Sequence, residues 1–467
     1  MYKELENLAK KIWDNPELKF NEKVSSKLQI DFMKSQGFMI RENLAEIPTA
    51  FSAIWGSSGP KIAFLGEFDA LSGMSQKADL FHKESIITGA PGHGCGHHLL
   101  GVGSMEAAIK LKNYIIENDI EATVVYFGCP GEEGGSGKAF MVKQGVFNDI
   151  DIALTWHPFN HNHVITGSTL SNIQCYVSYK GISSHAASSP HLGRSALDAL
   201  ELTNIGVQFL REHMEDTDRI HYSIIDSGSK SPNVVQSYAK GLYLIRSRNN
   251  ESVLSLFERF KDIVRGSALI AGVDYNIEFD KSCSNVIPNR TLEELLYTAF
   301  LEAGPCRYTE DEKKYANGFK QNFPNVNFKN QSVMQMTEDY QKELNYMKNN
   351  PLDEKILEYN FNNSIMMGSS DVGDVSNIVP TAQISVACFA FGTIGHSWEE
   401  VAQGKSSIAM KGMHKASEVL YLTAVKLLQN TDIIKQAKKE LSERTHNKFI
   451  SPVPDGKKPN INYAPGV

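Results

Sequence analysis

The sequence has few cysteines, no long apolar run and no excess of basic residues. Six of its 467 residues are cysteine, and no two of them form a Cys-x-x-Cys pair. We therefore expect free thiols in a reducing compartment rather than a disulfide framework. No apolar run reaches the length of a membrane-spanning helix, and the first residues are polar and charged, unlike a secretory signal. These absences predict a cytoplasmic protein with no membrane partner.

The charge balance excludes a further class of partner. Lys and Arg number 47 against 54 Asp and Glu, which gives a net charge of −7. A nucleic-acid binder usually carries a basic face, so we expect no nucleic acid. Hydrophobic residues make up 41% of the chain, enough for a buried core, and the length favours two or three domains.

The first part of the chain alternates between helical and strand patterns. Short apolar runs that end at polar, glycine-rich segments predict strands, and apolar spacing at helical period predicts helices between them. The predicted strands are 61–66, 122–128 and 152–156, and the predicted helices are 2–14, 22–36 and 99–117. This order indicates an α/β domain with a mixed, mostly parallel sheet between helices. In such sheets, functional side chains gather beyond the carboxyl ends of the strands.

The pattern changes near residue 170. Alternating segments flank two long amphipathic helices, 195–214 and 252–270, which predicts an inserted α+β domain of two layers. We expect the first domain to comprise residues 1–171 and 285–467, with the insertion at 172–284. In the second part we predict helical surface excursions within 307–363, a strand at 383–391, and a final helix at 406–428 before a surface tail.

The segment PGHGCGHHLLG, around Cys95 and His97, has the side chains of a metal site. Thiolate and imidazole are preferred ligands of zinc, and imidazole also suits manganese. The segment opens a helix, whose N-terminus is expected to lower the pKa of Cys95. Glycine-rich loops with histidines also occur at phosphate sites, so this segment alone leaves both interpretations open.

Two adjacent carboxylates, Glu132 and Glu133, follow the predicted strand at 122–128. Two acids in one cleft need separate partners, which suggests a division of roles. Glu133 would bind a metal, and Glu132 would take a proton from the attacking water and pass it to the leaving amine. The alternative is a solvated acidic turn, the usual meaning of an isolated Glu-Glu pair.

Two histidines, His157 and His396, follow predicted strands in the same way. A single histidine of this kind is more typical of a buried structural imidazole. Because both lie in the loop layer that holds Cys95 and Glu133, their convergence favours a metal site. We interpret His161 and His163 as loop histidines.

Six segments in one order carry a family resemblance. They are PGHGCGHHLLG, CPGEEGGSGKAFMV, LTWHP, SSHAASSPHLGRSALDA, SPNVVQSYA and GSSDVGDVS. Together they resemble the dinuclear metallopeptidase and amidohydrolase family that includes aminoacylase and glutamate carboxypeptidase. Within it, the chain is most similar to the group that hydrolyses p-aminobenzoyl-glutamate, from residue 13 to the helix after His396.

The resemblance implies a centre of two divalent ions, Mn²⁺ or Zn²⁺. It implies that Cys95 bridges the ions and that Glu132 is the general base, with Asp69 orienting a ligand. Asp371 stands in a loop near the site, where it either supports the site or forms a turn. The implied protein ligands are Cys95, His97, Glu133, His157 and His396. Glu67 stands where many relatives carry a metal-binding histidine and is left out, and the contribution of His98 stays open.

The resemblance also assigns the inserted domain to dimerisation and to substrate contacts. His185 would stabilise the oxyanion, often in the site of the partner subunit, while Asn233 and Arg246 would hold the substrate carboxylate. The partner is a second copy or a related subunit.

The implied activity is hydrolysis of an N-acyl amino acid, foremost p-aminobenzoyl-glutamate or a related folate breakdown product. Two alternatives are a dipeptidase with the same machinery and a weakly catalytic subunit that completes a partner's site. A metal-storage module is disfavoured because Glu132 would have no purpose there.

Overall fold

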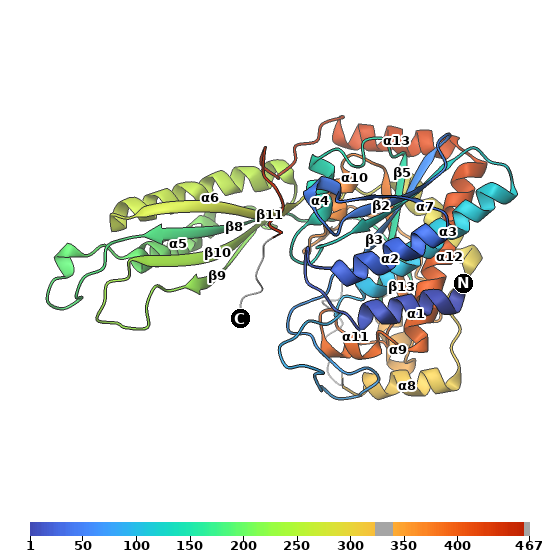
Figure 1. The fold of residues 1–467 in the computed structure, drawn as a ribbon, viewed down its shortest axis with the longest axis horizontal. Helices are drawn as coiled ribbons and strands as arrows, with labels where there is room; N and C mark the ends of the chain where they lie inside the picture. Colours follow the sequence, from blue (N-terminus) through green and yellow to red (C-terminus); the bar gives the residue numbers. More distant parts are fainter. Residues whose placement is uncertain (323–339, 462–467) are drawn as a thin grey trace.

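A mixed seven-stranded sheet forms the centre of the larger part of the molecule in a computed structural model, which describes residues 1–322 and 340–461 (Figure 1). Its strands are β1 (Met39–Glu42), β2 (Phe51–Trp55), β3 (Lys61–Glu67), β4 (Thr123–Cys129), β5 (Ile152–Phe159), β6 (His163–Ile165) and β13 (Thr381–Ala387). They are ordered β1-β2-β4-β3-β5-β13-β6, and the four central strands run parallel. The sheet confirms the predicted α/β class.

Helices cover both faces of this sheet, because its central strands are apolar on both sides. Ile62 and Phe64 of β3 belong to the larger core, whereas Ala63 and Leu65 belong to the core on the opposite face. The larger core is formed with α1 (Tyr2–Trp13), α2 (Lys23–Ser35), α3 (His97–Glu117), α7 (Arg290–Ala303), α12 (Ser407–Gln429) and α13 (Asp432–Thr445). The opposite core is formed with α4 (Gly137–Lys143) and α10 (Val372–Ser376). Among the described residues, no helix combines the length and apolarity needed to span a membrane.

A second, four-stranded antiparallel sheet projects sideways from this body (Figure 1). Its strands are β8 (Ser171–Lys180), β9 (Arg219–Asp226), β10 (Tyr238–Ser247) and β11 (Asp274–Cys283), and its helices are α5 (Ala196–Leu210) and α6 (Asn250–Ala271). Alternate residues of β8, from Ile173 to Tyr179, are buried in a core shared with both helices. The predicted two-layer insertion is confirmed, and its boundaries at 172 and 284 stay predictions.

Some predicted boundaries were wrong. Strand β5 continues through His157 and Pro158, beyond the predicted end at residue 156. Pro158 lacks an N–H, but this part of β5 pairs only with β13, so a proline is tolerated there. Strand β13 stops at Ala387 rather than at residue 391, and helix α13 was not predicted.

The polar stretch at 307–363 contains two of the expected surface helices. These are α8 (Glu310–Lys320) and α9 (Tyr340–Asn349), whereas residues 350–363 form no helix. Residues 323–339 of this stretch lie outside the described residues. A short helix, α11 (Trp398–Gln403), follows the loop that carries His396.

Candidate metal centre

The loop before α3 places Cys95 and His97 two residues apart at the start of that helix. Gly96 between them has φ +68°, and a Cβ at this position would lie 2.6 Å from the Pro158 ring. Glycine is therefore the residue that lets the backbone turn so closely against β5. This local geometry brings Cys95 next to His157, with 3.3 Å between Sγ and Nε2.

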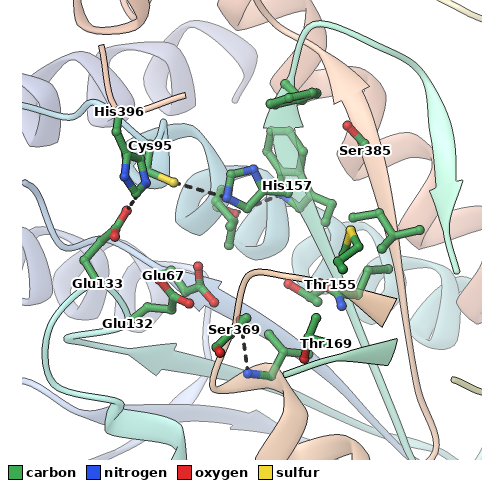
Figure 2. A pocket seen from close by; sticks show the side chains of 18 of the residues that line it. Glu67, Cys95, Glu132, Glu133, Thr155, His157, Thr169, Ser369, Ser385 and His396 are labelled. Atoms are coloured by element: carbon green, nitrogen blue, oxygen red, sulfur yellow. Dashed lines mark hydrogen bonds and ion pairs between the residues drawn. The ribbon is translucent and has the colours of Figure 1, made fainter. Parts of the chain in front are cut away.

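His396 reaches the same place from a different loop. Its φ is +60°, which is uncommon for a residue with a side chain. The conformation is held by two hydrogen bonds from its backbone N–H, to the Gly94 carbonyl at 2.8 Å and to Glu400 Oε2 at 3.1 Å. Its Nε2 lies 3.1 Å from Glu133 Oε1. Figure 2 shows the resulting ring of side chains, with the His396–Glu133 and Cys95–His157 contacts drawn as dashed lines.

Three overlapping groups in this ring could hold metal ions. Within each group, one ligand atom per residue lies within 4.8 Å of the others. The groups are Cys95, His97 and His157; Cys95, Glu133 and His396; and Glu67, His97 and Glu132. The structure thus brings together all five predicted ligands and Glu132, and Cys95 is common to two of the groups.

Asp69 supports this arrangement from behind. Its Oδ1 lies 2.9 Å from His97 Nδ1, and its Oδ2 accepts the backbone N–H of Glu133 at 2.9 Å. One buried carboxylate therefore turns the His97 Nε2 atom toward the other donors and fixes the loop that carries Glu133. The His97 Nε2 atom is buried and lies 3.2 Å from Glu67 Oε2, but it makes no hydrogen bond among the described residues. A buried nitrogen without such a partner, beside thiol and carboxylate groups, suits a divalent cation.

Burial and carboxylates dominate the electrostatics. Burial raises the pKa of Glu132 well above its usual value, and the charges of Glu67 and Glu133 raise it further. Burial and nearby carboxylates, Glu133 first among them, also raise the pKa of Cys95 well above its usual value. The prediction that the helix N-terminus lowers the pKa of the Cys95 thiol was therefore wrong when only the groups of the protein act on it. For His97, burial would lower the pKa, but Asp69 and Glu67 outweigh it and raise the pKa well above the usual value.

A buried chain of charges beside the centre was not predicted. Lys138 is fully buried, and its Nζ lies 2.7 Å from Glu67 Oε1 and also contacts Asp371 Oδ1. Asp371 Oδ2 in turn accepts the Lys138 backbone N–H at 2.9 Å. Asp371 is therefore connected to Glu67 of the candidate centre through Lys138. The sequence does not single out Lys138, because α4 carries a lysine at each end of its apolar run, Lys138 and Lys143.

The structure also places His98, whose contribution was left open, and the two histidines that were interpreted as loop residues. His98 points away from the centre, and its Nε2 lies 2.8 Å from the Gly404 carbonyl. His163, interpreted as a loop residue, instead lies in strand β6 and lines the cavity of the candidate centre. Like His163, His161 is buried, but it lies between β5 and β6.

The substrate-contact candidates on the second sheet lie in two places. Arg246 on β10 donates from Nη1 to Ser369 Oγ at 2.8 Å, and Ser369 lines the cavity. His185 and Asn233 are at least partly exposed and close to each other, since the Ala186 N–H donates to the Asn233 carbonyl at 2.9 Å. Neither of these two lines the cavity of its own chain.

Comparison with known proteins identifies the family. Residues 169–269 match the M20 peptidase dimerisation domain. Over 458 residues, the chain is 40% identical to a subunit of p-aminobenzoyl-glutamate hydrolase from Escherichia coli K12, covering 97% of this chain and 95% of that protein. The chain belongs to the M20 peptidase family. As a member of this family, it is a hydrolase of amide bonds. Strands β8, β9 and β10 of its second sheet lie within the match to the dimerisation domain, and β11 follows it.

Further M20 relatives and structures agree with this assignment. Xaa-Arg dipeptidase of mouse is 30% identical over 61% of this chain and 65% of its own length. The crystal structure of the YXEP protein of Bacillus subtilis, described as a dinuclear metal-binding M20 peptidase, has the same fold. Its TM-score is 0.56 at 16% identity, over 92% of this chain and 98% of that one.

Proposed function

We propose that this chain is a metal-dependent amidohydrolase that cleaves p-aminobenzoyl-glutamate or a related folate breakdown product. The observation that carries the proposal is the convergence of five metal-ligand side chains and Glu132. All six belong to overlapping groups of close ligand atoms, and all except His97 line one cavity. The 40% identity to a p-aminobenzoyl-glutamate hydrolase subunit over nearly the whole chain supports this substrate. The six free cysteines are in keeping with a reducing cytoplasm.

Two divalent cations, Mn²⁺ or Zn²⁺, would be held by Cys95, His97, Glu133, His157 and His396. In this proposal Cys95 would be shared by both cations, because it belongs to the group of His97 and His157 and to the group of Glu133 and His396. Sulfur, imidazole and carboxylate donors together admit either metal. When bound, the cations polarise the substrate carbonyl and acidify water.

Glu132 is the general base and then the general acid. It lines the cavity beside the ligands, and the two candidate groups that share Cys95 are complete without it. It takes a proton from the attacking water and delivers it to the nitrogen of the departing amino acid. Asp69 keeps His97 and the Glu133 loop in position during this transfer.

The remaining catalytic groups come from the dimerisation domain. Because His185 and Asn233 do not line the cavity of their own chain, we assign them to the site of a partner, where His185 stabilises the oxyanion. The partner is a second copy or a related subunit; the subunit designation of the Escherichia coli relative supports the second option. Arg246 instead lies beside its own cavity and holds a substrate carboxylate.

Release of p-aminobenzoate tests the proposed function. The purified chain, loaded separately with Mn²⁺ and Zn²⁺, is expected to release p-aminobenzoate from p-aminobenzoyl-glutamate. A parallel panel of dipeptides, including ones that end in arginine, tests the alternative favoured by the similarity to Xaa-Arg dipeptidase. Hydrolysis of dipeptides without release of p-aminobenzoate would replace the proposed substrate by the alternative.

Replacement of Arg246 by Met is expected to raise KM for p-aminobenzoyl-glutamate and to change kcat little. The lost charge-assisted hydrogen bond corresponds to roughly a ten- to hundred-fold increase in KM. Steady-state kinetics measure the two constants, and the exposed Arg265→Met on α6 is the matched control. An unchanged KM in Arg246→Met would remove Arg246 from the substrate contacts.

A further inference from the structure

The cavity extends beyond the candidate metal ligands, along the face of three neighbouring strands. It has a volume of about 270 Å³ and is lined by residues of β5, β13 and β6 as well as by Cys95, Glu133 and His396. Paired residues of neighbouring strands point to the same face of a sheet. The pairing places His157, Ser385 and His163 in one row and Thr155, Gln383 and Ile165 in the next. Figure 2 shows Thr155 and Ser385 on the side of His157 away from Cys95 and Glu133.

This inner part of the cavity carries no charged side chain among the described residues. The acidic residues of the lining, Glu67, Glu132 and Glu133, all belong to the candidate metal centre. The inner lining is apolar or neutral, with Phe159 and Ile165 among its apolar members. A carboxylate placed here would lose its hydration without gaining a positively charged partner. The glutamate part of the substrate is therefore disfavoured at this end of the cavity.

Two neutral polar side chains of the inner part are free to bind a ligand. Gln383 is half buried, lines the cavity and makes no side-chain hydrogen bond with any described residue. His163 is buried, also lines the cavity, and likewise makes no side-chain hydrogen bond with any described residue. Burial and the neighbouring His161 lower the pKa of His163 to about 3, so its imidazole is neutral with one donor and one acceptor nitrogen.

The other polar side chains of these rows already have partners. Ser385 Oγ donates to the His161 carbonyl at 3.1 Å, and Thr155 Oγ1 donates to the Leu65 carbonyl at 3.1 Å. These hydrogen bonds stabilise the strands. Gln383 and His163 are therefore set apart from their neighbours by unused hydrogen-bonding capacity at a cavity wall.

We infer that the inner part of the cavity binds the acyl group of the substrate as a flat ring with a neutral hydrogen-bonding substituent, selected by Gln383 and His163. The inference rests on the proposed function and deepens it by fixing the orientation of the substrate. The ring lies along the uncharged strand face, the scissile amide lies beside Glu132, and the carboxylates face outward toward Arg246. An arylamine fits this wall because its two N–H groups can donate to the Gln383 side-chain oxygen and to the acceptor nitrogen of His163.

A comparison of three substrates tests the inference without any mutation. These are p-aminobenzoyl-glutamate, benzoyl-glutamate and p-carboxybenzoyl-glutamate, with the metal-loaded protein. The kcat/KM for the amino substrate is expected to exceed that for the benzoyl substrate by roughly ten-fold or more, and the carboxy substrate is expected to be the poorest. Equal kcat/KM for the first two would overturn the inference and leave the proposed function intact. Hydrolysis of none of the three would overturn both.

Two variants assign the effect to residues. Gln383→Leu and His163→Phe are each expected to lower kcat/KM roughly ten-fold for the amino substrate and to leave benzoyl-glutamate within about two-fold. Calorimetry gives a second readout, because the wild type should bind p-aminobenzoate more tightly than benzoate and Gln383→Leu should not. The exposed Gln429→Leu is the matched control. Equal losses on both substrates would show that the two side chains act only on the structure and would refute the inference.

Discussion

Replacement of Glu132 by Gln is expected to lower kcat by roughly 10²- to 10⁴-fold, the usual contribution of a general acid–base. The substitution keeps the shape of a side chain that lies close to Glu67 and Glu133, and it removes an ionisable group whose pKa is raised by burial and by these two carboxylates. The fold should therefore be retained while the proton can no longer be accepted. The measurement is the initial rate of p-aminobenzoate release at saturating metal.

The controls for this variant separate proton transfer from metal binding. Glu132→Gln should keep the metal content of the wild type, because the five proposed ligands are unchanged. Glu121→Gln, on an exposed loop, removes a carboxylate elsewhere and should keep the wild-type rate. A rate for Glu132→Gln within about three-fold of the wild type would contradict its role, since that loss is far below the usual contribution. A loss of metal together with the rate would instead make Glu132 a ligand.

The parts of the site that could be predicted are those with a local chemical signal. Cys95 and His97 stand out because a thiol and an imidazole lie between glycines at a helix start. Glu133 and His157 stand out because each comes after an apolar run of the sequence. The parallel sheet then explains why such segments meet, since the carboxyl ends of β3, β4, β5 and β13 lie at one edge.

The parts that could not be predicted depend on pairings between distant residues. The contact of Lys138 with Glu67 joins residues 71 positions apart (138 − 67), and no local pattern reveals it. His163 was assigned to a loop because β6 has three residues, too few to show an alternating pattern. Its place on the cavity wall comes from the antiparallel pairing of β6 with β13.

The end of β5 shows a related effect. His157 interrupts an apolar run, and proline, here Pro158, is rare within a sheet. Both residues therefore predicted the end of the strand. The strand continues because β13 pairs with it as far as Phe159. This continuation places His157 on the strand itself, which is a more rigid support for a ligand than a loop.

Removal of metal is expected to abolish activity and to lower the stability of the fold. Chelation should lower kcat/KM by roughly three orders of magnitude or more, because cations of this kind supply several kcal/mol to the transition state. It should also lower the melting temperature, since a ligand that binds only the folded state stabilises it. Re-addition of Mn²⁺ or Zn²⁺ should restore both. Full activity after exhaustive chelation would overturn the proposed function.

Cys95→Ser tests the predicted loss of metal and of stability at a single ligand atom, the Cys95 sulfur. Cys95 belongs to both the His97–His157 group and the Glu133–His396 group, so its loss should weaken both sites at once. We expect the variant to retain less than about half of the wild-type metal after dialysis and to show little gain in melting temperature when metal is added. Cys306→Ala, a buried cysteine outside the cavity, is the matched control and should bind metal as the wild type does. If Cys95→Ser retained two tightly bound ions, the thiol could not be the shared ligand, and the two candidate groups would have to be independent.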